Sequence, residues 1–390
     1  MPIWPLLATL SVQTLATMAL YSMPTLAPEV ARDLRVNGAL VGGFVATAYG
    51  VGIISALLSP GLIRRYGGVR ATQAVLLAAA GMLAIAASSF GIAGLAFAAV
   101  VLGSGYGAAA PASTHLLVPH TPASVFNLIM SLRQIGVPLG GVFAALVLPP
   151  LVPLVGWRGS LLLELVPVFL LIVSMEVPRR KWDSDHDPRV RPWGRTLLQP
   201  FLLLRDNRLR RLSVSCFIYS GLQLCFVAFM TVQLTTTVGF DLIRSGQMLA
   251  AYQIAGSVSR PVWGWIADRH LTPVRTLTVH GLGMAAAAGM AGQFGSGWSS
   301  AWVLGVVLLA GCTAGGYTGV AYAEYAALGG TRRTEATGLG TALMFSGGLL
   351  IPPMFGASIT FFGEWSMTYR AMALLALLAA VLMGWRSRRQ

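Results

Sequence analysis

Two arginines lie inside long apolar stretches of this sequence, where charge is rare. Arg260 precedes Asp268 by eight residues, and Arg133 lies about eight residues inside the stretch that begins near residue 125. If both stretches are membrane helices, the two guanidinium groups reach a similar level, roughly 12 Å from the inner surface. Charge at that depth is costly and normally faces the bundle interior or a water-filled cavity. Both arginines are therefore candidates for binding an anionic substrate, because their planar donor fork matches a carboxylate.

Structural ion pairs are the alternative explanation for these arginines. Glu164 and Glu324 are the acids that fall within the apolar stretches, apart from Glu29 at a helix end. Neither is expected at the depth of the arginines, so pairing with backbone carbonyls also stays open. If transport is linked to protons, Glu164 or Glu324 is expected to carry the proton, since a buried carboxylate can bind and release one.

Polar and aromatic side chains on other apolar stretches could line the same cavity. Each is more often a packing or hydrogen-bonding residue than a ligand contact. They are Gln13, Tyr21, Tyr49, Tyr106, Gln223 and Tyr317.

The composition is that of an integral membrane protein. Hydrophobic residues make up 55% and charged residues 10% of the 390 residues, and the mean hydropathy is +0.71. Three scattered cysteines and five scattered histidines, without ligand spacing, predict no metal site, and nothing indicates a cofactor. The net charge of +14 lies mostly in short loops, which favours membrane orientation over nucleic-acid binding.

Twelve apolar segments of membrane-spanning length are predicted, the first of them a retained helix and not a signal peptide. They lie at about 6–28, 38–60, 71–90, 92–118, 125–148, 157–177, 212–236, 245–266, 276–294, 299–327, 336–362 and 367–385. With the N-terminus in the cytoplasm, the inner loops and the C-terminal tail hold 20 of the 27 Lys and Arg residues. The positive-inside rule then predicts that both termini are cytoplasmic, in the inner membrane of the cell.

The two halves of the sequence are related. A shift of 204 residues places Gly52 on Gly256 and Arg65 on Arg269, and slightly larger shifts align later segments. We therefore expect an all-α membrane protein with an N-terminal six-helix half (1–177), a basic cytoplasmic linker (178–211) and a C-terminal six-helix half (212–390). A site between two such halves, near the bilayer midplane, is typical of transporters.

The sequence resembles the major facilitator superfamily over essentially the whole chain. The loops after the second and eighth apolar segments carry the most specific part of this resemblance. That family carries Gly-x-x-x-Asp-Arg-x-Gly in the first loop and a weaker copy in the second. Here the second copy reads Gly264-x-x-x-Asp268-Arg269, and the first has Arg64 in place of the Asp, followed by Arg65 and Gly67. The resemblance implies the major facilitator fold and a gating role for Arg64, Arg65, Asp268 and Arg269, in which a carboxylate at a helix end pairs with Arg or with a facing helix N-terminus.

The eighth segment also resembles oxalate/formate antiporters and monocarboxylate transporters of that superfamily. Its pattern is Arg260-Pro261-x-x-Gly264-x-x-x-Asp268-Arg269. The resemblance implies that Arg260 binds a substrate carboxylate. Those carriers have an acidic residue one turn earlier, where this chain has Gly256.

Three function classes follow. A secondary transporter for a small organic anion, with a proton or a counter-anion as possible coupling partner, fits two buried arginines and few buried acids. Proton-driven efflux of drugs or metabolites is the alternative, but it would favour an embedded acid in the first or fourth segment. An enzyme or receptor is disfavoured, because the sequence has no catalytic constellation and no soluble domain. The protein is expected to act as a monomer.

Overall fold

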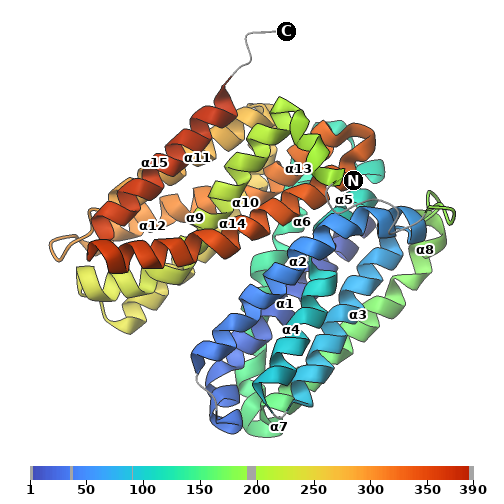
Figure 1. Ribbon diagram of the computed structural model, residues 1–390, viewed down its shortest axis with the longest axis horizontal. Helices are drawn as coiled ribbons and strands as arrows, with labels where there is room; N and C mark the ends of the chain where they lie inside the picture. Colours follow the sequence, from blue (N-terminus) through green and yellow to red (C-terminus); the bar gives the residue numbers. More distant parts are fainter. Residues whose placement is uncertain (1–2, 36–37, 90, 191–198, 386–390) are drawn as a thin grey trace. The chain divides into compact units, whose positions relative to one another are not determined.

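The computed structural model describes residues 3–35, 38–89, 91–190 and 199–385, and these residues are helical nearly throughout (Figure 1). No strand occurs within those ranges. Arg191 and Arg195 of the predicted linker, and the two chain ends, lie outside the described residues. The fold is therefore all-α.

The α-helices of the first part of the chain are α1 (Ile3–Leu34), α2 (Gly38–Tyr66), α3 (Gly68–Ala87), α4 (Ile92–Tyr106), α5 (Ala109–Leu117), α6 (Phe126–Gln134), α7 (Gly136–Ser174) and α8 (Glu176–Trp182). Those of the second part are α9 (Asn207–Gln233), α10 (Leu242–Arg269), α11 (Pro273–Ala291), α12 (Ser300–Ala314), α13 (Thr318–Gly329), α14 (Arg333–Phe362) and α15 (Trp365–Gly384). Shorter 3-10 helices also occur, η1 (Val118–His120), η2 (Ala123–Val125), η3 (Gln199–Arg205) and η5 (Gly330–Arg332), together with the π-helix η4 (Leu234–Val238).

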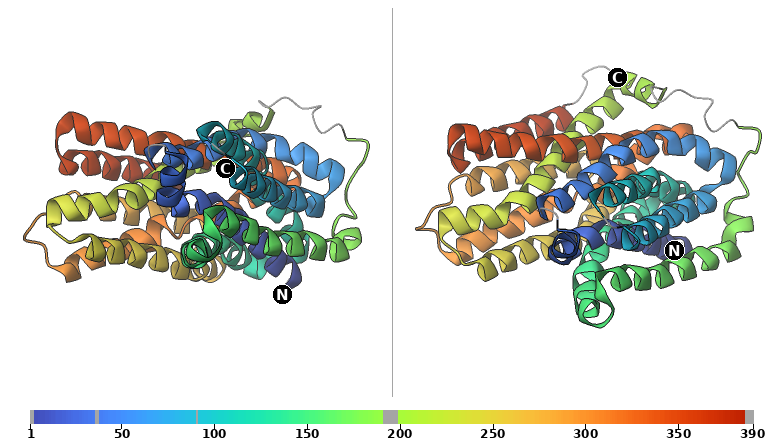
Figure 2. Two further views of the ribbon diagram at one scale, coloured as in Figure 1. Left: turned by 90° about the horizontal axis from the view of Figure 1, so that it is seen from below. Right: turned by 60° about the horizontal axis from the view of Figure 1, so that its bottom comes forward.

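Among the described residues, eight helical stretches are long and apolar enough to cross a membrane, so the chain is a multi-pass membrane protein. Two of them, Ala123–Ser174 and Ser300–Phe362, are far longer than the ~20 residues that one crossing needs. Within the first, Gly156 has φ 72°, a conformation that favours glycine, and α7 turns back at this end (Figure 2). This kink falls between the segments predicted at 125–148 and 157–177. The count of twelve stays a prediction.

Three predicted segments are each divided into two helices, and the one at 125–148 is divided at Ile135, between α6 and α7. The segment at 92–118 breaks after Tyr106, and the one at 299–327 breaks after Ala314. These last two breaks lie at glycines that touch another helix: a Cβ added at Gly107 would lie 2.0 Å from the Gly52 carbonyl oxygen, and one added at Gly315 would lie 2.8 Å from the Gly256 Cα. Close packing between helix backbones, which small residues permit, accompanies each of these two breaks.

The chain forms two compact units. Unit 1 comprises Met1–Pro122, Arg133–Leu203 and Gly329–Ala342. Unit 2 comprises Ala123–Leu132, Leu204–Leu328 and Leu343–Gln390. Each unit thus contains one short segment from the other part of the chain: the start of α6 belongs to unit 2, and the start of α14 belongs to unit 1. The prediction of two halves divided at a linker does not anticipate this exchange.

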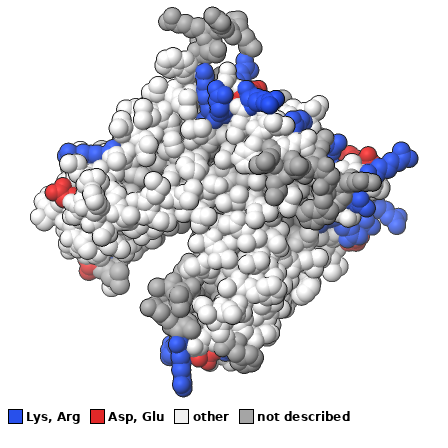
Figure 3. Space-filling view, in the orientation of Figure 1, with Lys and Arg blue, Asp and Glu red and all other residues white. Residues whose placement is uncertain are grey.

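Within unit 1, α7 packs against α1 and α3, and α4 packs against α2 and α3. Within unit 2, α11 packs against α15 and α12, and α10 packs against α12. Large apolar side chains such as Phe97, Leu146 and Trp302 are exposed along the helices. Lys and Arg gather near the ends of helices and leave broad uncharged sides, as Figure 3 shows. Such sides suit contact with lipid.

Candidate functional site

Arg133 is held in the interior of unit 1. It lies in the last turn of α6, and only 1% of its surface is exposed. Its Nη2 donates hydrogen bonds to Gln13 Oε1 (2.6 Å), the Ala109 carbonyl (3.0 Å) and Ser113 Oγ (3.0 Å), and its Nη1 donates to Gln134 Oε1. These acceptors fix the orientation of the guanidinium.

Close packing of α7 on α1 brings this part of the chain to Gln13. A Cβ at Gly136 would lie 2.8 Å from the Leu10 carbonyl oxygen, and one at Gly140 would lie 2.4 Å from the Thr14 carbonyl oxygen. Tyr21 lies farther along the same contact, beside Gly141. The small residues after Arg133 therefore set its position against α1.

Gln13 links Arg133 to two of the predicted tyrosines. Its Nε2 donates to Thr17 Oγ1 (2.9 Å) and to the Tyr106 hydroxyl (3.5 Å), and Thr17 Oγ1 lies 3.1 Å from the same hydroxyl. The Tyr49 and Tyr106 rings stack with centroids 6.3 Å apart. Unit 1 thus brings together Arg133, Gln13, Tyr106 and Tyr49. Thr17, Gln134 and Ser113 complete the network and were not predicted. Thr17 could have been found from its position one turn after Gln13.

Arg260 is held in unit 2 by the end of another helix. It is 4% exposed, and its Nε donates to the Gly315 carbonyl oxygen (2.9 Å), just past the C-terminus of α12. One turn later, Trp263 Nε1 donates to the Cys312 carbonyl (2.8 Å) at the same helix end. Carbonyls at a helix C-terminus lack intrahelical partners and carry partial negative charge, which stabilises a cation there.

The other two residues predicted in unit 2 are in aromatic surroundings. The Tyr317 ring is fully buried and meets the Tyr219 ring edge-on, with centroids 5.6 Å apart. The Gln223 backbone carbonyl accepts a hydrogen bond from the Tyr252 hydroxyl (3.5 Å). Tyr252 also lies within electrostatic reach of Arg260.

The two predicted proton carriers lie in different units. Glu164 is on α7 in unit 1, is 3% exposed and accepts a hydrogen bond from Ser22 Oγ at 2.7 Å. Glu324 is on α13 in unit 2 and lies within electrostatic reach of Arg208, at the start of α9. Ser22 was not predicted.

At the end of α2, the arginines that replace and follow the family aspartate contact two later segments. Arg64 Nη1 lies 3.9 Å from Glu335 Oε1 in the first turn of α14, and the Arg64 carbonyl accepts from the Asp187 amide (2.9 Å). Arg65 Nη1 donates to the Val190 carbonyl (3.1 Å). The linker segment 183–190 therefore packs on the end of α2.

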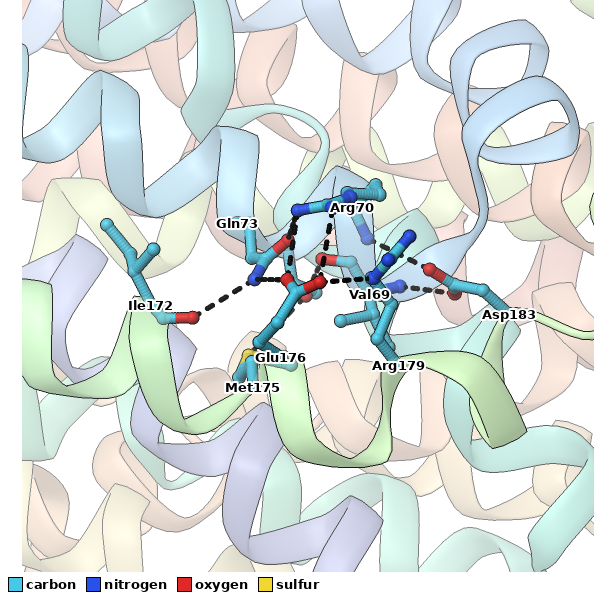
Figure 4. Close-up of polar contacts among 9 residues, drawn as sticks. Val69, Arg70, Gln73, Ile172, Met175, Glu176, Arg179 and Asp183 are labelled. Carbon is cyan, nitrogen blue, oxygen red and sulfur yellow. Dashed lines mark hydrogen bonds and ion pairs between the residues drawn. The ribbon is translucent and has the colours of Figure 1, made fainter.

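Asp183 of this linker caps α3. Its carboxylate accepts hydrogen bonds from the Val69 amide (2.7 Å) and the Arg70 amide (3.3 Å), as Figure 4 shows. A Cβ at Gly67, whose φ is 95°, would lie 2.2 Å from Asp183 Cγ, so glycine is needed there for both conformation and space. Burial raises the pKa of Asp183 above the usual aspartate range, and the two amide hydrogen bonds oppose this rise.

A second cluster in Figure 4 joins α3 to the start of α8. Arg70 pairs with Glu176 through two contacts of 3.0 and 3.2 Å, and Gln73 Nε2 donates to the Ile172 carbonyl (3.0 Å) and to Glu176 Oε2 (3.1 Å). The cluster fixes α8, and with it the start of the linker, against α3.

At the end of α10, Asp268 caps α6. Its Oδ1 accepts from the Asn127 amide (3.0 Å) and from Asn127 Nδ2 (2.8 Å), and its Oδ2 accepts from the Leu128 amide (2.9 Å). Arg269 is exposed in the last turn of α10. A carboxylate at a helix end thus meets the N-terminus of another helix, which is the contact expected of the gating motif. Asn127 and Glu335, which contact Asp268 and Arg64, are partners that sequence reasoning missed.

Comparison with known proteins identifies this architecture. Residues 6–328 match the description "Major Facilitator Superfamily". The chain is 27% identical over 282 residues to the 4-hydroxybenzoate transporter PcaK of Pseudomonas aeruginosa, a match that covers 64% of this chain and 62% of the length of that relative.

Two solved structures show the same fold. The human organic anion transporter MFSD10 (TETRAN) is 16% identical with a TM-score of 0.75, and the match covers 98% of this chain and 100% of that one. The E. coli fucose:proton symporter FucP is 15% identical with a TM-score of 0.75, and the match covers 99% of each chain. At these identities the likeness extends to the fold alone.

Proposed function

Because this chain belongs to the Major Facilitator Superfamily of transporters, we propose that it moves a small organic anion, a carboxylate, across the cytoplasmic membrane by alternating access. The observation that carries the proposal is the burial of the Arg133 guanidinium in an apolar bundle, where oxygens of Gln13, Ala109 and Ser113 hold it in a fixed orientation. A positive charge held in this way inside an apolar bundle attracts an anion strongly, because little water screens it.

We propose that Arg260 contacts the substrate carboxylate and that Arg133 contacts a second accepting group. The resemblance of the Arg260 segment to oxalate/formate antiporters and monocarboxylate transporters supports the first assignment. The relative PcaK, named for 4-hydroxybenzoate, supports an aromatic carboxylate with a second polar group. Tyr49, Tyr106 and Gln13 support Arg133 through the network described above, and Tyr21, Gln223 and Tyr317 are proposed as further contacts.

The predicted topology belongs to the same proposal. Twelve spans in two six-helix halves, with both termini in the cytoplasm, would place 20 of 27 Lys and Arg residues on the inner side. We propose that the protein works in this orientation as a monomer in the inner membrane.

Transport by purified protein in liposomes tests the proposal. Counterflow of labelled 4-hydroxybenzoate, benzoate, oxalate and formate should reveal at least one transported anion, whereas fucose and a cationic dye should not be moved. A thermal-shift screen with the same compounds reports binding separately. Movement of the dye without any of the anions would contradict the proposal and favour proton-driven efflux.

Lysine variants then test the two arginines. Arg260→Lys keeps the charge but loses the planar fork, so affinity should fall by several kcal/mol. Arg133→Lys should weaken the binding of 4-hydroxybenzoate more than that of benzoate, because only 4-hydroxybenzoate carries a second polar group. Arg244→Lys is the matched control, since Arg244 lies exposed near the start of the same helix as Arg260. If Arg260→Lys and Arg260→Ala both transport at the wild-type rate, the assignment of an organic anion fails.

A further inference from the structure

Ser22 and Glu164 form a buried pair inside unit 1. Ser22 is on α1 and is fully buried, and Glu164 is on α7, with 3% of its surface exposed. Ser22 Oγ lies 2.7 Å from Glu164 Oε2 and 2.8 Å from the Met18 carbonyl oxygen. Both distances fit hydrogen bonds.

One hydroxyl hydrogen cannot serve both contacts at once. A serine hydroxyl donates one hydrogen bond and accepts up to two. If Glu164 is protonated, Oε2 donates to Ser22 Oγ, and Ser22 Oγ donates to Met18. If Glu164 is ionised, the Ser22 hydrogen turns to Oε2 and the contact with Met18 is lost. Only with a protonated carboxyl are both contacts of Ser22 Oγ, to Glu164 and to Met18, hydrogen bonds at the same time.

The second oxygen of Glu164 points to the same conclusion. Among the described residues, Oε1 is buried and has no hydrogen-bond partner. An ionised carboxylate would leave that oxygen without a donor and place a charge in the buried interior of unit 1, which is costly. A neutral carboxyl avoids the charge.

The charged groups on the helices that pack against α7 fall near helix ends. Glu164 contacts elements of unit 1 through α7, which packs against α1, α3 and α8. On α7 itself, Arg158 is six residues away, about 9 Å along the helix, and pairs with Asp33 of α1. The other charged residues of these helices are at helix ends: Glu29, Arg32, Arg70, Glu176, Arg179, Arg180 and Lys181.

We propose that Ser22 and Glu164 form a proton-binding site, and that its proton couples to anion movement. Binding forms the Oε2–H bond and turns the Ser22 hydroxyl toward Met18, and release reverses both changes. The coupling rests on the proposed function, whereas proton binding by the pair can be measured without any anion. The proposal selects Glu164 over Glu324 as the coupling acid and adds Ser22 as its partner.

Infrared spectroscopy of the purified protein in lipid tests proton binding directly. The wild type should show the C=O stretching band of a protonated carboxylic acid at neutral pH, and the band should lose intensity as the pH rises. Glu164→Gln should remove the band, and Ser22→Ala should shift it by removing the hydrogen bond. Ser160→Ala is the matched control, because Ser160 is a buried serine one turn from Glu164 that donates to the Gly156 carbonyl; it should leave the band unchanged. A band that survives in Glu164→Gln, or that is absent from the wild type, overturns the proposal.

Transport of labelled 4-hydroxybenzoate in liposomes tests the coupling. With an imposed pH gradient, the wild type should accumulate the anion, and Glu164→Gln should reach only the level found without a gradient. Counterflow, which needs no net proton movement, should survive in Glu164→Gln and shows that the variant is folded. Gradient-driven accumulation by Glu164→Gln overturns the coupling. A pH-sensitive band in a wild type that moves none of the anions would reject the proposed function and the coupling while supporting the proton site.

Discussion

The ends of α2 and α10 meet other helices through opposite charges. We call the contact between the end of α10 and the start of α6 the α10 joint. There Asp268 accepts hydrogen bonds from the first turn of α6. We call the contact between the end of α2 and the start of α14 the α2 joint. There Arg64 occupies the position related to Asp268 by the repeat, and it pairs with Glu335 in the first turn of α14. The starts of α6 and α14 are themselves related by a shift of about 207 residues. The acid is thus on the helix end in one joint and on the helix start in the other.

The two joints therefore share the arrangement of their helices but differ in the charged groups that hold it. Both joints hold the start of one helix against the end of another, yet only the α10 joint uses the partial positive charge of the helix N-terminus directly. In the α2 joint a half-exposed arginine reaches a buried glutamate over 3.9 Å. We expect the α10 joint to be the stronger, because its acceptor is charged and makes three hydrogen bonds.

Each joint contains a glycine in close contact with the backbone of another helix, and substitution of this glycine should have the largest effect on stability. In the α10 joint, a Cβ at Gly264 would lie 2.7 Å from the Asn127 carbonyl oxygen. In the α2 joint, a Cβ at Gly338 would lie 2.6 Å from the Ala56 carbonyl oxygen. We expect Gly264→Ala and Gly338→Ala each to destabilise the protein by roughly 2 kcal/mol, since neither backbone can yield easily. Thermal unfolding in detergent measures this.

Gly305→Ala is the matched control for these two variants. Gly305 lies within α12 with open space at its Cβ position, so alanine should stabilise the helix slightly. If all three substitutions behave alike, close backbone contact does not define the joints.

Removal of the charge from the α10 joint should have the next largest effect. Asp268→Asn keeps one acceptor but loses the ionic character of the cap, which should cost about 1.5 kcal/mol. Ser131→Cys provides a reporter, because Ser131 is fully buried on α6, against Gly264 and Gly319. We expect a maleimide to label this cysteine faster when Asp268→Asn is also present.

Asp241→Asn controls for the loss of an aspartate cap. Asp241 caps α10, its own helix, through the Arg244 amide. It should leave the labelling rate of Ser131→Cys unchanged. Equal labelling rates in the Asp268→Asn and wild-type backgrounds would show that Asp268 does not hold α6 in place.

The sequence predicts more of the α10 joint than of the α2 joint. The resemblance of Gly264-x-x-x-Asp268-Arg269 to the family motif anticipates a carboxylate facing a helix N-terminus. The replacement of the family aspartate by Arg64 is visible in the sequence, but its partner Glu335 is about 270 residues away. No local pattern marks such a partner, because it depends on which helix start lies against α2.

A similar limit applies inside the units. Apolar runs predict where helices occur, and a charge within such a run singles out Arg133 and Arg260. The acceptors that hold them are hydroxyls, amides and backbone carbonyls, such as Ser113 and Gly315, and these groups occur on every helix. The helix breaks at Gly107 and Gly315 were also missed, because an apolar run rich in glycine looks continuous.

The caps of α3 and α11 extend the comparison to pH. α3 is capped by Asp183 from the distant linker, whereas α11 is capped by its own Thr272. Since burial raises the pKa of Asp183, the folded state binds its proton more tightly than the unfolded state does. The stability that this residue contributes is therefore greatest at acidic pH and falls as the pH rises through the raised pKa, by at most about 1.4 kcal/mol per pH unit.

Asp183→Asn removes this dependence. The unfolding temperature of the wild type minus that of Asp183→Asn should decrease as the pH is raised from acidic to neutral values. Thr272→Ala should cost about 1 kcal/mol at every pH, because the hydroxyl does not titrate in this range. A difference for Asp183→Asn that grows with pH would mean that the amide hydrogen bonds outweigh burial.

The smallest effect is expected for the ion pair of the α2 joint. Arg64 is 49% exposed on its side chain, so Arg64→Gln should cost less than ~1 kcal/mol, and less still at high salt. Glu335 also pairs with Arg332 and keeps that partner in the variant. Arg64→Asp, which restores the family residue, should destabilise the protein more than Arg64→Gln, because it places a second carboxylate beside Glu335.

A double-mutant cycle isolates this repulsion. When Glu335→Gln is added, the destabilisation caused by Arg64→Asp should fall to that of Arg64→Gln, since the opposing carboxylate is gone. Restoring the family aspartate would then be harmless only where α14 has lost its acid, which is the result expected if the α2 joint is a charge-reversed form of the α10 joint. If Arg64→Asp is tolerated equally with and without Glu335, the two residues do not interact, and the α2 joint is held by the packing at Gly338 alone.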